Sequence, residues 1–127
     1  MKPRLKKFSR NSVNVPALVA AVRAIAAEHP DFCYRHNGDG TSCLYKPTPR
    51  NGRVTGCLIG EGLRRIGVST AGLDKRALVG IKNLLRRVGL AAQFPEEASW
   101  LSDVQSNQDR GHTWGDAVRT ASTEDEE

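Results

Sequence analysis

The chain has no apolar run long enough to cross a membrane, no internal repeat and no low-complexity core. These absences exclude a repeat array and a helical transmembrane span and leave an ordinary globular domain as the expectation. Cysteine is scarce too, with three residues, Cys33, Cys43 and Cys57. An odd number fits poorly with a disulfide framework and favours a reducing compartment, so a cytoplasmic location is predicted.

The N-terminus imitates a secretion signal, because a basic segment precedes the alanine-rich residues 17–27. Arg23 interrupts the apolar part, and Pro16 stands near its start. The apolar residues follow helical spacing rather than one continuous run, so we expect no secretion signal.

Charge is distributed unevenly over the 127 residues. The formal net charge is +5, although four of the fourteen acidic residues are the last four, Glu124 to Glu127. The rest of the chain is therefore strongly basic, which favours an acidic partner such as nucleic acid or an acidic protein face. The competing interpretation is that dispersed Arg and Lys side chains only keep a small protein in solution.

The sequence predicts one globular domain over residues 14–121, preceded by a basic flexible arm (1–13) and followed by an acidic disordered tail (122–127). The predicted class is α+β, mostly helical, with about four to five helices and one β-hairpin. The hairpin is expected over residues 32–46, where aromatic residues flank Asn-Gly and Asp-Gly turn signals. We favour a turn at Asp39-Gly40, because it pairs aromatic residues across the strands.

A first helix is predicted over residues 15–29, with Asn14 or Ser12 as its cap. A second, from Thr55 to Gly67, contains Gly60 and Gly62, which indicate the close approach of another backbone. Later helices are expected at 75–88 with Asp74 as cap, from Pro95 to a stop at Gly111, and from Thr113 to about Ala121.

Zinc is the first chemical hypothesis, because Cys33, His36, Cys43 and Cys57 can be written as a Cys3His set. An odd separation along a strand places Cys33 and His36 on opposite faces, so the spacing is a weak signal. Buried thiols that behave as small apolar side chains explain the same residues. No metal site and no cofactor are therefore predicted.

A cysteine-dependent hydrolase is the second hypothesis. Cys57 is expected in the first turn of a helix, where free amide groups favour a thiolate. His36 or His112 would serve as the base, but nothing in the sequence marks either histidine. The alternative is that Cys57 fills a tight space beside two glycines, and an enzyme is the less favoured interpretation.

Nucleic-acid binding is the third hypothesis. The predicted helix over residues 55–67, followed by the basic helix at 75–88, is typical of a helix-turn-helix, although the connector is long for that motif. The N-terminal arm would add phosphate contacts. The candidate residues are Lys2, Arg4, Lys6, Lys7, Arg10, Lys75, Arg76, Lys82, Arg86 and Arg87. The competing interpretation is an amphipathic helix whose charged side faces water.

The stretch Gln105 to Asp109 is unusually polar for the end of a helix. It is either a recognition surface or a hydrogen-bonding joint that fixes the last helix. We favour the joint, because stop and start signals for helices follow it directly.

Two patches together resemble small uncharacterised proteins of actinobacteria and their bacteriophages. The patches are Gly56-Cys57-Leu58-Ile59-Gly60 and the ending Gln108-Asp109-x-Gly111-x-x-Trp114. The resemblance covers residues 32–67 and 100–120 and carries no known activity. It implies a cytoplasmic accessory protein, of bacterial or phage origin, that acts on a host component.

The favoured expectation is therefore a small non-enzymatic binding protein that acts on a cellular or host protein, without a membrane partner. The two alternatives are a nucleic-acid-binding protein that uses the basic helix and arm, and a hydrolase centred on Cys57.

Overall fold

The computed structural model describes residues 5–33, 48–50, 53–55, 57–71, 73 and 80–123, and the structural statements below concern these residues. Six helices and two short strands occur among them. They are α1 (Val15–Glu28), β1 (Thr48–Arg50), β2 (Arg53–Thr55), α2 (Leu58–Arg65), α3 (Ile81–Arg87), α4 (Leu90–Gln93), α5 (Pro95–Asp109) and α6 (Trp114–Thr123).

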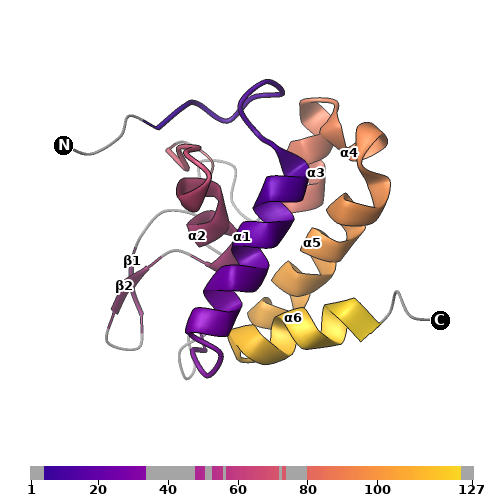
Figure 1. Cartoon of the computed structure of the whole chain (residues 1–127). Coiled ribbons are helices and arrows are strands. Elements are labelled where there is room, and N and C mark those ends of the chain that lie inside the picture. Colours follow the sequence, from indigo (N-terminus) through magenta and orange to yellow (C-terminus); the bar gives the residue numbers. More distant parts are fainter. Residues whose placement is uncertain are drawn as a thin grey trace.

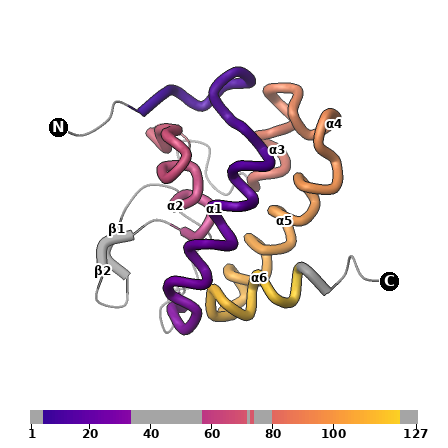
Figure 2. Tube along the Cα trace, viewed as in Figure 1, coloured from indigo at the N-terminus to yellow at the C-terminus, as the bar shows by residue number. Residues whose placement is uncertain are grey.

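Helix α5 lies at the centre of the domain, where it contacts each of the other five helices (Figure 1). Helix α1 packs beside it and also contacts α2 and α6. The Cα trace shows residues 5–14 passing over one end of the domain, next to α3 and α4, while α6 crosses the opposite end (Figure 2). The core is apolar and draws on all six helices, with Leu18, Leu58, Ile59, Leu63, Ile81, Leu85, Leu101 and Trp114 fully buried.

The predicted α+β class is wrong, because the described residues form an all-α domain. Of the expected hairpin at 32–46, only Phe32 and Cys33 are described, and neither lies in a strand. Phe32 serves α6 instead: its carbonyl accepts a hydrogen bond from the Trp114 amide at 2.8 Å, and its ring meets the Trp114 ring at 4.6 Å between centroids. The aromatic ring of Phe32 therefore makes a packing contact with α6, and the rest of the predicted hairpin, residues 34–46, lies outside the described residues.

Strands β1 and β2 pair antiparallel over three residues each, with Thr48 opposite Thr55. They lie away from the helices (Figure 1) and form no layer of the core. Proline and glycine at Pro47, Pro49 and Gly52 are typical of a loop, so the sequence gives no signal for this short ladder.

The start of α1 follows from local chemistry. The Asn14 side chain accepts a hydrogen bond from the Ala17 amide at 3.0 Å, and Pro16 occupies the first turn. The helix ends at Glu28, just before His29-Pro30. The predicted cap and stop of this helix are confirmed.

Replacing Asn14 with alanine is expected to lower the free energy of unfolding by about 1 kcal/mol, because the Ala17 amide loses its acceptor. Urea denaturation of the two proteins measures the difference. Asn14→Ser keeps an acceptor and should restore most of the loss. Equal stability of the alanine variant and the parent protein would show that the cap does not operate.

One later helix boundary differs from the sequence prediction, and one short helix, α4, was not predicted. Gly80 has extended backbone (φ −72°, ψ 156°), so α3 begins at Ile81 instead of Lys75. The predicted cap Asp74 and the residues Lys75 and Arg76 lie outside the described residues. The short helix α4 follows directly, because Gly89 takes a left-handed conformation (φ 82°) that ends α3 and redirects the chain.

Residues 5–13 are attached to the domain. Lys6 forms a parallel bridge with Val68: its amide donates to the Gly67 carbonyl at 2.8 Å, and its carbonyl accepts from the Ser69 amide at 2.7 Å. Val13 is buried in the core, and Phe8 packs against it. This part of the predicted arm therefore has a fixed position against α2 and α1.

Helix α2 lies close to α1, as its glycines predicted. A Cβ atom placed on Gly62 would lie 2.8 Å from Val22 Cγ2 and 3.0 Å from Leu18 Cδ1. The cap of α2 is Cys57, whose sulfur accepts from the Gly60 amide at 3.4 Å, and not Thr55. Glycine at position 62 therefore sets the distance between the two helices.

Candidate functional site

Among the described side chains, the exposed cations that have no ion pair, hydrogen bond or ring contact lie in two segments. Among the described side chains, five basic residues are exposed and show no ion pair or hydrogen bond to a described partner: Lys6, Lys7, Arg10, Arg86 and Arg87. Three of them belong to residues 5–10 and two to the end of α3. All five are among the residues that the sequence proposed for nucleic-acid contact.

The other described cations are engaged. Arg64 pairs with Glu61 at 2.5 Å, and Arg119 pairs with Asp116. Arg65 donates to both carboxylate oxygens of Glu28 at 2.8 Å, and this hydrogen bonding lowers the pKa of Glu28. The positive charge of these arginines is therefore largely neutralised where they stand.

Three further cations are held by partners without a full charge. Arg23 stacks on the Trp100 ring at 4.4 Å, and Arg110 donates to Asn107 Oδ1 at 2.6 Å. Lys82, also predicted as a nucleic-acid contact, donates to Ser99 Oγ at 3.3 Å and is half-buried. Lys82 is thus a weaker candidate than its two neighbours on α3.

Acidic residues are excluded from the two basic segments. Residues 1–27 contain no Asp or Glu, and neither do residues 75–95. Acidic side chains occur on α5 and α6, at Glu96, Glu97, Asp103, Asp109 and Asp116, and the first two directly follow the second segment at the start of α5. Because the acid-free segments meet at one end of the domain (Figure 1), that end carries concentrated positive charge. We call it the basic end, defined by residues 5–16 and 81–94.

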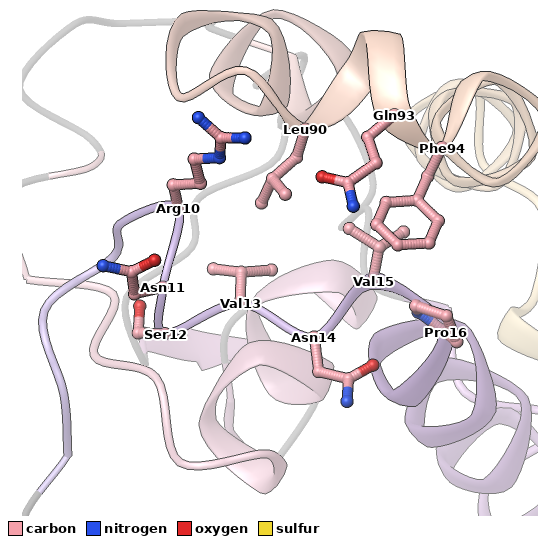
Figure 3. Close-up of a pocket in the computed structure, with 10 residues that line it drawn as sticks. All are labelled: Arg10, Asn11, Ser12, Val13, Asn14, Val15, Pro16, Leu90, Gln93 and Phe94. Carbon is pink, nitrogen blue, oxygen red and sulfur yellow. The ribbon is translucent and has the colours of Figure 1, made fainter.

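A pocket of ≈ 610 Å³ opens at the basic end, between residues 10–16 and the α4 region. This volume lies within the range of about 300–1,000 Å³ that is usual for ligand sites. Leu90 and Gln93 reach into it from α4, Val13 and Val15 face them, and Arg10 and Phe94 stand at opposite ends (Figure 3). Asn11, Ser12, Asn14 and Pro16 complete the lining.

Helix α3 is not placed as the recognition helix of a helix-turn-helix. Such a helix presents its N-terminal residues to base edges. Here Ile81 is fully buried, and its amide donates to the Gln105 side chain at 2.8 Å inside the domain. Residues 66–80 also separate α2 from α3, far more than the usual turn of about three or four residues. Among the residues of α3, only those at its exposed C-terminal end, Arg86 and Arg87, therefore stay candidates for nucleic-acid contact.

The polar end of α5 is the predicted joint. Asn107 Nδ2 donates to the Ala117 carbonyl of α6 at 3.2 Å, which confirms that this stretch holds the last helix. Sequence reasoning missed a second role. Gln108 Oε1 accepts from the Leu58 amide at 2.7 Å, and Gln105 Oε1 accepts from the Ile81 amide at 2.8 Å. Two buried glutamines of one helix thereby cap the first residues of two others.

The structure removes the thiolate that the hydrolase hypothesis requires. Cys57 is fully buried and disulfide-bonded, so its sulfur is not a free nucleophile in this form. His112 lies in the connection between α5 and α6, and the other proposed base, His36, lies outside the described residues.

The zinc set is only partly visible, because His36 and Cys43 lie outside the described residues. The Cys33 thiol donates to the Gly111 carbonyl at 3.3 Å, which places it beside the end of α5. Within the described residues, no three His, Cys, Asp or Glu side chains gather closely enough to hold a metal ion.

No protein-family model, curated protein or solved structure matches this chain. The resemblance to actinobacterial and phage proteins, and the host partner that it implies, stay predictions. None of the helices in the described part of the chain has the length and apolar character needed to span a bilayer.

Proposed function

We propose that this protein is a small non-enzymatic binding protein that holds nucleic acid at the basic end. The observation that carries the proposal is the location of the unpartnered cations: all five exposed ones lie on residues 5–10 and on α3. The other basic side chains that the structure describes, on α1, α2 and α6 and at Lys82 and Arg110, each have a partner. Phosphate groups are the usual ligands of clustered, unpaired Lys and Arg side chains, because these side chains can bind phosphate without first breaking an ion pair.

A protein partner, the first expectation from the sequence, has weaker support. Positive charge concentrated at one end of the domain can bind a polyanion. It can bind an acidic protein only if the surface of that protein is complementary in shape to the basic end. No surface among the described residues points to the cellular or host protein that the resemblance implies. It stays a prediction, as does a cytoplasmic location.

Titration of the purified protein with labelled DNA and RNA, by fluorescence anisotropy at several salt concentrations, tests the proposal. Five phosphate contacts predict that log K falls with log salt at a slope of roughly −4, depending on the form of nucleic acid. The double variant Arg86→Gln and Arg87→Gln should flatten the slope by about 2.

The matched control is the double variant Arg65→Gln and Arg119→Gln, which removes the same number of positive charges from ion-paired sites. It should leave the slope close to that of the parent protein. The proposal fails if the protein binds neither DNA nor RNA at low salt. It also fails if both double variants change the slope equally.

A further inference from the structure

The pocket at the basic end carries polar groups that the described structure does not use. Arg10, Asn11 and Gln93 make no side-chain hydrogen bond to any described residue, although all three line the pocket. By contrast, the Asn14 side chain is already engaged in capping α1. A guanidinium and two carboxamides thus remain available to a ligand, together offering donors at one end and both donors and acceptors at the other.

These groups are arranged along the pocket in a definite order. Arg10 and Asn11 stand at one end, and Gln93 lies beside Phe94 at the other (Figure 3). Leu90 and Val13, both almost fully buried, form an apolar middle. No acidic side chain lines the pocket. A ligand that fits this order has an anionic group, an apolar or flat body, and an amide-like polar edge beside Phe94.

We propose that the pocket receives one unpaired nucleotide, with its phosphate at Arg10 and its base against Phe94. The Gln93 carboxamide then bonds the polar edge of the base, while Asn11 reaches the sugar or phosphate. A flat base with donors and acceptors on its edge satisfies both Phe94 and Gln93. This proposal rests on the proposed function and adds that single-stranded or looped nucleic acid is the preferred form.

Duplex nucleic acid does not meet the same requirements. Each base in a duplex is covered by its neighbours and paired along its edge, so it cannot lie on Phe94 or bond Gln93. Phosphates of a duplex still reach Arg10, Arg86 and Arg87. The pocket therefore distinguishes single strands from duplexes, whereas the cations around it do not.

The test compares a short single-stranded oligonucleotide with its duplex, each titrated against the parent protein and three variants. Gln93→Ala and Phe94→Leu should weaken single-strand binding by roughly fivefold to a hundredfold and leave duplex binding almost unchanged. The double variant Arg86→Gln and Arg87→Gln should weaken both forms. Gln93 is exposed, so its variant remains informative if Phe94→Leu loses its fold by circular dichroism.

A base-analogue probe, 2-aminopurine within the single strand, adds a direct readout. Its fluorescence should change when the parent protein binds and should not change with Phe94→Leu. If single strand and duplex bind equally and Gln93→Ala alters neither, the pocket proposal fails while binding at the basic end stands. If neither nucleic acid binds, both proposals fail together.

Discussion

The double variant Gln105→Leu and Gln108→Leu is expected to lower the free energy of unfolding by about 2–6 kcal/mol, or to prevent folding. Each glutamine accepts a hydrogen bond from the first amide of another helix, Leu58 of α2 or Ile81 of α3. Leucine has a similar volume but no acceptor, so each substitution leaves a buried amide unpaired at a cost of about 1–3 kcal/mol. Urea denaturation of the single and double variants measures the loss of stability for each glutamine alone and for the two together.

The matched control is Gln93→Leu, which makes the same chemical change at an exposed position. It should alter stability by no more than about 0.5 kcal/mol. The single variants lie on one face of α5 and share neighbours, so their effects need not add fully. If Gln108→Leu proves as harmless as the control, the Leu58 amide does not depend on that side chain.

Helix ends were the part of the fold that the sequence predicted best. Asn14, Pro16 and Gly111 act on the backbone within a few residues of themselves, so their effects can be worked out without knowing the fold. The same locality explains the correct start of α5 at Pro95. Signals of this kind carry over directly from sequence to structure.

The errors came from residues whose partners are distant in the chain. Phe32 was assigned to a strand because its neighbours alternate, yet its contact is Trp114. Gln105 and Gln108 looked like one polar helix end, although their partners lie in α3 and α2. No pattern in a single sequence specifies such pairs, because the packing of the helices decides them.

The candidate site also has features that the sequence predicts and features that it does not. The basic residues were identified from composition, but which cations stay unpartnered depends on where Glu28 and Glu61 fall. The pocket was not predicted, because Arg10 and Phe94 come to line the same pocket only when residues 10–16 fold over α4. Single-sequence reasoning therefore found the charges and missed the shape that gives them a specific role.

Leucine at position 62 is expected to be the most damaging single substitution on the contact between α1 and α2. The first added carbon already lies 2.8 Å from Val22 Cγ2. Because the Val22 side chain is β-branched, it has few other rotamers in a helix that would relieve this contact. Three more carbons must displace one helix from the other, at a cost of about 3 kcal/mol or more. Ala24→Leu, at an exposed position on α1, is the control and should be nearly neutral.

Gly62→Ala separates this crowding from helix propensity. Alanine favours a helix over glycine by about 1 kcal/mol, whereas overpacking costs about 1–3 kcal/mol, so the net change should be a modest loss of stability. Val22→Ala removes the nearest atom, and in that background the propensity gain should prevail and Gly62→Ala should stabilise the protein. A double-mutant cycle by urea denaturation measures this reversal. If Gly62→Ala has the same effect in both backgrounds, contact with Val22 is not what requires glycine at this position.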